Sequence, residues 1–197
     1  MRVPRSLLRV FEKRGITNID SFLAPSSWSQ VPRPLTIPGM EPVVNRILAA
    51  IHHKEPTAVF GDYDCDGLAS CAILKATIEL AGHSCLPYLP HRDEGYGLSK
   101  DAVLQFAKQG IQLIVTVDNG IAAHESIRLA KRLGIDVVVI DHHSKTTDPE
   151  DARAIVWDPE YCAGSLTLMA AWGILEHFHS GDKLNSCPIQ DEPEGRY

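Results

Sequence analysis

Hydrophobic residues in the central part of the chain occur in short uninterrupted runs, separated by longer stretches in which they recur every three or four positions. Continuous apolar runs rich in Val and Ile are typical of strands that are buried on both faces of a parallel sheet. The alternation of such runs with helical spacing therefore predicts an α/β fold, with a mainly parallel sheet and helices on both faces. The strands are expected at residues 58–60, 85–89, 113–117, 137–140 and 154–156.

Helices are expected between these strands, where start and stop signals frame the periodic stretches. Ser99 is a suitable N-cap for a helix over 99–108, and glycines at 82, 110 and 134 stop three of the helices. Gly164 and Ser165 indicate a turn before the last helix. The helices are expected at residues 68–81, 99–108, 124–133 and 166–178.

The first 55 residues have a different pattern and predict a helical leader that packs on the α/β domain of residues 56–180. Residues 1–24 carry basic side chains at helical spacing, which form either a solvated face or a contact for nucleic acid. A proline-rich connection over 25–38 and a helix over 41–53 follow. Residues 181–197 are expected to be a tail or an interrupted continuation. The basic residues of the leader are Arg2, Arg5, Arg9 and Lys13.

Composition narrows the class of protein. With 197 residues and 44% hydrophobic content, the chain can bury a sizeable core. The net charge of −6 argues against a broad basic surface that coats nucleic acid, although a local basic patch can still guide a polyanion. Five cysteines without a CxxC pair indicate reduced thiols. Because the chain has neither a long apolar run nor a signal peptide, we expect a cytoplasmic protein that does not enter a membrane.

Three aspartates follow the first predicted strand in the sequence GDYDCDG. Asp62, Asp64 and Asp66 occupy alternate positions in what we expect to be a strand-to-helix loop. Close unpaired carboxylates raise one another's pKa, whereas a divalent cation with oxygen ligands keeps them ionised. The alternative is a solvated turn, since Asp and Gly are common turn residues.

Two further strands also end on acidic residues, and this favours the metal site over the turn. Asp118 follows the strand at 113–117, and Asp141, His142 and His143 follow the strand at 137–140. The carboxyl ends of parallel strands lie at one edge of the sheet, where ligands bind in such folds. Clustered Asp and His side chains match the ligand set of hard or borderline divalent ions.

A glycine-rich, charged loop at residues 91–97 follows another strand. Arg92 is suited to bind a phosphate, and Tyr96 is suited to stack on a base. The alternative is a surface loop with a local Arg–Glu ion pair.

Four motifs in a fixed order resemble the DHH phosphoesterase family, and specifically its branch of RecJ-like single-strand exonucleases. They are GDYDCDG, PHRDEGYGLS, VTVDNGI and VVVIDHH, between residues 61 and 143. The resemblance implies an enzyme that removes nucleotides from the 5′ end of single-stranded DNA, using two Mn²⁺ or Mg²⁺ ions that activate a water molecule for attack on phosphorus. It also implies a role in DNA repair or replication assemblies.

The resemblance also implies roles for individual residues. The metal ligands are Asp64, Asp66, Asp118 and His142. His143 lies beside the scissile phosphate and Asp141 supports the cluster, so both are assigned to catalysis. Asp62 supports the ligands without binding metal itself. Arg92 and Tyr96 hold the DNA strand.

Two features of the family have no counterpart in this sequence. A further aspartate, expected after the strand and helix near 154–178, is missing, and so is the C-terminal DHH-associated domain that clamps substrate. Two alternatives to the exonuclease therefore remain: a catalytically weak binding module, and a phosphodiesterase for dinucleotides or short oligonucleotides. We expect either a fragment of a longer enzyme or a shortened natural protein.

Overall fold

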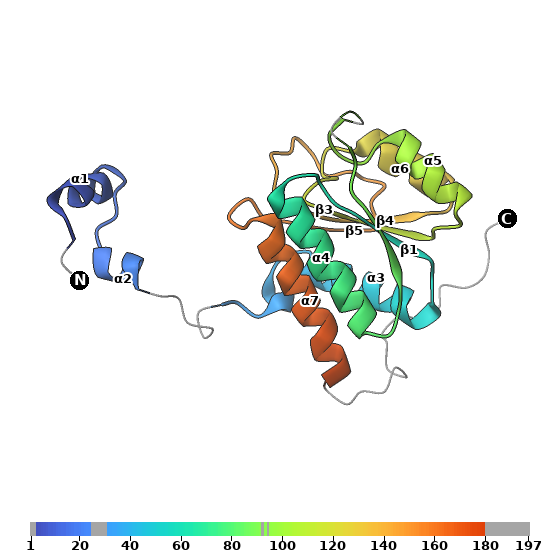
Figure 1. Cartoon of the computed structure of the whole chain (residues 1–197), viewed down its shortest axis with the longest axis horizontal. Helices are drawn as coiled ribbons and strands as arrows, with labels where there is room; N and C mark the ends of the chain where they lie inside the picture. Colours follow the sequence, from blue (N-terminus) through green and yellow to red (C-terminus); the bar gives the residue numbers. More distant parts are fainter. Residues whose placement is uncertain (1–2, 25–30, 92, 94, 180–197) are drawn as a thin grey trace. The chain divides into compact units, whose positions relative to one another are not determined.

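The computed structural model describes residues 3–24, 31–91, 93 and 95–179 (Figure 1). The chain divides into two compact units, Met1–Pro32 and Arg33–Tyr197. The second unit contains the sheet and all the acidic residues of the predicted metal site.

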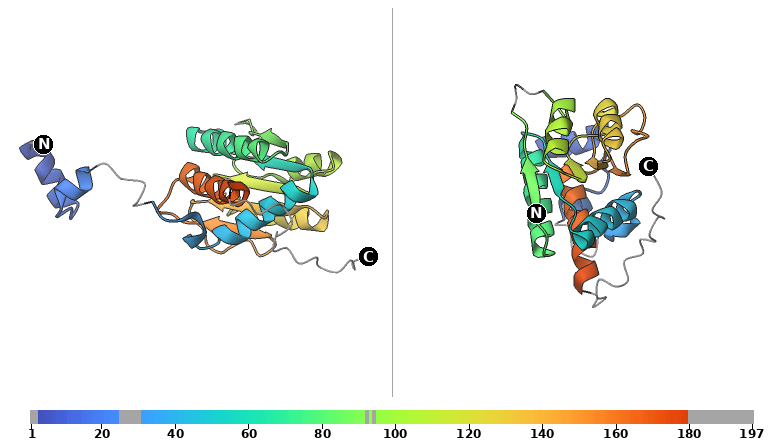
Figure 2. Two further views of the ribbon diagram at one scale, coloured as in Figure 1. Left: turned by 90° about the horizontal axis from the view of Figure 1, so that it is seen from below. Right: turned by 90° about the vertical axis from the view of Figure 1, so that its right-hand side faces the viewer.

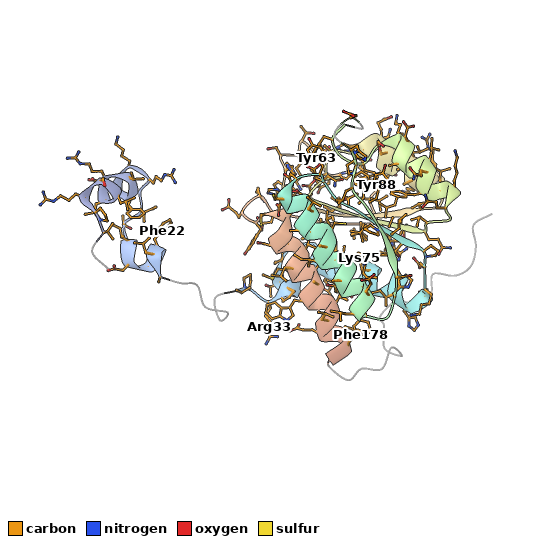
Figure 3. The ribbon with its side chains drawn as sticks, viewed as in Figure 1. Phe22, Arg33, Tyr63, Lys75, Tyr88 and Phe178 are labelled. Atoms are coloured by element: carbon orange, nitrogen blue, oxygen red, sulfur yellow. The ribbon has the colours of Figure 1, made fainter. Side chains whose placement is uncertain are left out.

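The first unit contains two short helices, α1 (Arg5–Lys13) and α2 (Ile19–Leu23). They are held together by an edge-to-face contact between the rings of Phe11 and Phe22 (Phe22 is labelled in Figure 3), whose centroids are 5.5 Å apart. The Asn18 side chain accepts a hydrogen bond from the backbone N–H of Ser21 and so caps α2. The packing of this leader on the α/β domain stays a prediction.

The second unit is built on a five-stranded sheet in which every neighbouring pair of strands is parallel, as the sequence predicted. Its spatial order is β2-β1-β3-β4-β5. The strands β1, β3 and β4 lie in the middle and are almost completely buried, which explains their uninterrupted apolar runs. The strands are β1 (Thr57–Phe60), β2 (Cys85–Tyr88), β3 (Leu113–Val117), β4 (Asp136–Asp141) and β5 (Ala154–Trp157).

Helices cover both faces of the sheet, which confirms the predicted fold class (Figures 1 and 2). The chain leaves β1 toward β2 and then returns past β1 to β3, so right-handed crossovers place α4 on one face and α5 and α6 on the other. Helix α4 packs beside α7, and α7 also contacts α3. The helices are α3 (Met40–His53), α4 (Cys65–Leu80), α5 (Lys100–Lys108), α6 (His124–Arg132) and α7 (Ala163–His179).

Helix α3 belongs to the second unit, although the sequence assigned it to the leader. It contacts β5 and α7, and most of its apolar side chains are buried. A 3-10 turn at Pro34–Thr36 precedes it and also contacts α7. At the far end of the sheet from the acidic residues, Arg46 joins α3 to β4 through ion pairs with Glu55 and Asp136.

Two helices begin earlier than the sequence predicted. Helix α4 starts at Cys65, because the Asp64 carboxylate accepts hydrogen bonds from the N–H groups of Asp66 and Gly67 and caps the helix. Asp66 therefore lies in the first turn of a helix and not in a loop. Helix α7 starts at Ala163, so Gly164 and Ser165 are helical and do not form the expected turn.

The four cysteines in the described part of the chain are free thiols. None of the helices described is both long and apolar enough to cross a membrane. The predicted tail at 181–197 lies outside the described residues.

Candidate metal centre

The acidic residues gather where the strand order of the sheet reverses. The chain runs outward from β1 to β2 and then back to β3, so the crevice between β1 and β3 opens at their carboxyl ends. Asp62 and Asp64 follow β1, Asp118 follows β3, and Asp141 ends β4. The convergence that the sequence predicted is therefore present in the fold.

Asp118 lies at the centre of this cluster. Its side chain is 1% exposed, and neither carboxylate oxygen has a hydrogen-bond partner among the described residues. Burial and the nearby charges of Asp66 and Asp64 raise the pKa of Asp118 to about 7. Its backbone φ of 63° is in the left-handed region, which is uncommon for a residue other than glycine, and residues in such conformations cluster at functional sites.

Asp62 and Asp64 approach Asp118 from the loop after β1. Carboxylate oxygens of these three residues all lie within 4.8 Å of one another, which is close enough to share a metal ion. Hydrogen bonding to the Gly67 N–H lowers the pKa of Asp64, so this residue is readily ionised. Asp62 is buried and accepts a hydrogen bond from the Tyr63 N–H. The structure thus places Asp62 at ligand distance, although we expected only a supporting role.

His142 and His143 complete the other side of the cluster. The Nε2 atom of His142 is 3.2 Å from Oδ1 of Asp118 and 3.8 Å from Oδ2 of Asp66. One nitrogen from each histidine and one oxygen of Asp118 also lie within 4.8 Å of one another. Asp118 therefore belongs to two potential ligand groups, one with acids and one with histidines.

Asp141 organises the two histidines and is not itself in either ligand group. Its Oδ1 atom accepts hydrogen bonds from the backbone N–H groups of His142 and His143, and its Oδ2 atom accepts one from the Ile121 N–H. The Nδ1 atom of His143 is 2.8 Å from Asp141 Oδ1. Burial opposes charge on His143, but its contact with the Asp141 carboxylate outweighs that effect and raises the pKa of His143.

Asp66 has a different environment from the other predicted ligands. Its two carboxylate oxygens accept hydrogen bonds of 2.8 Å from the backbone N–H groups of Ala163 and Gly164, at the start of α7. The carboxylate therefore joins the first turn of α4 to the first turn of α7. Asp66 still lies next to His142, so its assignment as a ligand stays a prediction.

Tyr96 reaches into the site from the loop before α5. Its hydroxyl group donates to the backbone carbonyl of Asp118 at 3.2 Å and lies 3.0 Å from Nδ1 of His143. Burial and the neighbouring charges of Asp141 and Asp118 raise the pKa of Tyr96, so it remains a neutral phenol. Its ring is half exposed, as a strand-holding residue requires. Arg92, the other predicted contact, lies outside the described residues.

Two residues that the sequence analysis did not select also support the site. The buried Asn119 side chain donates to the carbonyls of Phe60 and Val117, and so joins the ends of β1 and β3. Trp157, at the end of β5, donates its indole N–H to the His143 carbonyl at 2.7 Å. The sequence feature that could have pointed to either residue is its position at the end of a predicted strand.

The arrangement fits a divalent cation. Burying two carboxylate oxygens without partners is costly, and a cation with oxygen and imidazole ligands removes that cost. Asp64, Asp118 and His142 are suited to hold such an ion, with Asp62 and Asp66 beside them.

Metal affinity is expected to depend steeply on pH. Because the Asp118 pKa is about 7 without metal, an ion must displace a proton from this residue at lower pH. We expect the Mn²⁺ affinity to fall about fivefold from pH 7 to pH 6, with about one proton released per ion bound near pH 6. Calorimetry in buffers of different ionisation enthalpy measures both quantities. An affinity that is constant between pH 6 and pH 8 contradicts this account.

The fold and the cluster together define a parallel α/β protein with a group of acidic and histidine residues, suited to bind a divalent metal ion, at the topological switch point of its sheet. The chain belongs to the DHH family, whose N-terminal domain matches residues 56–188.

The chain is also similar to individual proteins of known identity. It is 39% identical over 124 residues to the single-stranded-DNA-specific exonuclease RecJ of Bacillus subtilis, a match that covers 62% of this chain and 16% of the relative. It is 36% identical over 160 residues to RecJ of Escherichia coli, covering 78% and 27% of the two chains. A crystal structure of exonuclease RecJ bound to manganese superposes with a TM-score of 0.67 at 27% identity, over 82% of this chain and 41% of that one. The chain thus spans about a quarter or less of the length of these curated relatives.

Proposed function

We propose that this chain carries the metal-binding domain of an exonuclease that hydrolyses single-stranded DNA from its 5′ end. The observation that carries the proposal is the pair of buried, unpartnered carboxylate oxygens of Asp118, which face His142 and the acids after β1. The similarity to RecJ proteins, one of them crystallised with manganese, supports both the metal and the substrate.

The residues that would hold the metal are Asp64, Asp66, Asp118 and His142, and we propose that they bind two ions, Mn²⁺ or Mg²⁺. When bound, such ions supply a water molecule of lowered pKa and neutralise charge that develops on phosphorus. The protein contributes a fixed ligand set, because Asp64 is held by the N-terminus of α4 and Asp118 by the end of β3. Asp66 fixes α7 relative to the cluster.

In the proposed reaction, His143 assists at the phosphate. Its ring is held by Asp141 and contacts the Tyr96 hydroxyl group, so its orientation is set from two sides. The raised pKa of His143 favours the imidazolium form, which attracts a phosphate oxygen. Tyr96 has an exposed ring beside this position, where a base of the DNA strand can stack. Association with DNA repair or replication proteins, and a cytoplasmic location, stay predictions.

Cleavage of a single-stranded oligonucleotide labelled at its 5′ end tests the proposal. Labelled mononucleotides are expected as the first product with Mn²⁺, and no product is expected with chelator. The alternative function, cleavage of dinucleotides or short oligonucleotides, predicts a rate that falls with substrate length. A chain that binds Mn²⁺ but cuts neither substrate is instead a binding module, and this result contradicts the proposed activity.

A further inference from the structure

A cavity of 690 Å³ adjoins the metal centre on the side of α6. It lies among the loop that carries Tyr96, the segment between β3 and α6, and the residues after β4. Asp141 and His143 form part of its wall, so the cavity opens directly onto the predicted reaction site. The mechanism described above uses none of the residues on its opposite wall.

That opposite wall is the N-terminus of α6. His124, Glu125 and Ser126 form the first turn of the helix and line the cavity. The residue before them, Ala123, offers no side-chain cap, so the three first-turn N–H groups have no partner within the described residues. Uncapped N–H groups and the helix dipole attract anions, and phosphate groups above all.

Ser126 gives independent evidence for a ligand. Its side chain is only 7% exposed and lines the cavity, yet its hydroxyl group makes no hydrogen bond to another described residue. A serine that packs inside a protein normally bonds to a neighbour or to the preceding turn of its helix. The Ser126 hydroxyl group is therefore available to a hydrogen-bond acceptor that enters the cavity.

Two carboxylates of the cavity wall do not oppose a bound phosphate as strongly as their charge suggests. Asp141 already accepts four hydrogen bonds, from three backbone N–H groups and the His143 ring. Glu125 is exposed and makes ion pairs with Lys100 at 2.9 Å and Arg128 at 3.3 Å. These partners neutralise much of the negative potential in the cavity.

The remaining wall is apolar and is formed by Leu98, Ile121 and Ala122, with Tyr96 at the rim. A cavity with a few convergent donors on one side and apolar side chains on the other fits a small molecule with an anionic end and a flat, weakly polar body. A nucleotide has both parts.

We propose that this cavity is a nucleotide subsite, in which the N-terminus of α6 and the Ser126 hydroxyl group bind the phosphate next to the scissile one. Its nucleoside then lies against Leu98 and Ile121. The inference rests on the proposed function, since it assigns the cavity to the same substrate. The phosphate is either a diester in the DNA strand or the monoester of a released mononucleotide.

Amide NMR of the chain in chelator tests the subsite without any cleavage. The probes are a deoxynucleoside 5′-monophosphate, a dinucleoside monophosphate and a deoxynucleoside without phosphate. We expect at least one phosphorylated probe to shift the amide signals of His124, Glu125 and Ser126. The stronger of the two identifies the monoester or the diester as the natural group. Binding of the bare deoxynucleoside with equal affinity overturns the proposal, and so does the absence of any shift.

Substitutions distinguish the effect of the Ser126 hydroxyl group on binding from an effect on folding. Ser126→Ala is expected to weaken binding of the phosphorylated probe about tenfold, the effect of one hydrogen bond to a charged group. Ser70→Ala is the matched control, because Ser70 is a buried serine whose hydroxyl group has no hydrogen-bond partner among the described residues, and it lies on α4, outside the cavity lining. Ala123→Asp places a carboxylate before the same N–H groups and is expected to abolish binding. Unchanged affinity in both Ser126→Ala and Ala123→Asp overturns the proposal. Cleavage assays with metal test the proposed activity, whereas binding in chelator tests the subsite. Either proposal can therefore be wrong while the other holds.

Discussion

Replacement of Asp118 by asparagine is expected to lower metal-dependent cleavage about a thousandfold or more while the fold remains intact. The substitution keeps the size of the side chain, and asparagine tolerates the left-handed backbone at this position. It removes the one carboxylate that belongs to both potential ligand groups. A metal site supplies several kcal/mol of transition-state stabilisation, which sets the size of the loss. Cleavage rates with Mn²⁺, measured beside an Asp101→Asn surface control, test the prediction.

The same variant is expected to be more stable than the unmodified protein at pH 8 without metal. Folding raises the pKa of Asp118 from 3.8 to about 7, so the proton on Asp118 stabilises the folded state. This stabilisation is fully present below pH 4 and is lost as the pH rises through 7. The full difference is about 4 kcal/mol, and about 3 kcal/mol of it lies between pH 5 and pH 8. Thermal unfolding in chelator at these two pH values measures that part. Mn²⁺ should stabilise the unmodified protein and not the variant. Wild-type cleavage, or a metal-induced stabilisation that survives in Asp118→Asn, contradicts the assigned site.

Replacement of Gly67 by alanine is expected to destabilise the protein by about 3 kcal/mol or more and to disrupt the metal centre. A Cβ atom at this position lies 2.5 Å from both the backbone nitrogen and the backbone oxygen of Asp62. Backbone atoms cannot move aside as a flexible side chain can, so the first turn of α4 must separate from the loop that carries the acids. For a chain of this size, the expected decrease in melting temperature is about 6 to 12 °C.

Gly110→Ala is the matched control for this experiment. Nothing lies within 4 Å of a Cβ atom at Gly110, whose φ of 74° makes alanine only mildly unfavourable, by about 1 kcal/mol. Thermal unfolding and Mn²⁺ binding are compared in the two variants. Equal losses of stability, or unimpaired Mn²⁺ binding by Gly67→Ala, contradict the close contact that the structure shows.

The sequence predicted the parallel sheet and the position of the site because both depend on local patterns. Buried strands such as Leu113–Val117 have uninterrupted apolar runs, and the residue after each run must lie at one edge of a parallel sheet. Asp62, Asp64, Asp118 and Asp141 could therefore be brought together before any coordinates were known. The order of the strands supplies the reason why they meet at one crevice.

Features that depend on contacts between distant residues could not be predicted. The early start of α7 follows from hydrogen bonds between Asp66 and N–H groups 97 and 98 residues away. The left-handed conformation of Asp118 was hidden in a sequence, Asp-Asn-Gly, that also suits an ordinary turn. The cavity beside α6 has no sequence signature, because Ser126 resembles any other helical serine until its missing partner is seen.

Location of manganese in crystals of this protein tests the metal centre most directly. Anomalous differences measured above and below the manganese absorption edge identify the ion without assuming its ligands. Manganese is expected between the carboxyl ends of β1 and β3, with an oxygen of Asp118 and a nitrogen of His142 at about 2.0 to 2.3 Å. Manganese that binds elsewhere on the protein, while this cluster holds none at saturating concentration and pH 8, contradicts the proposed metal site.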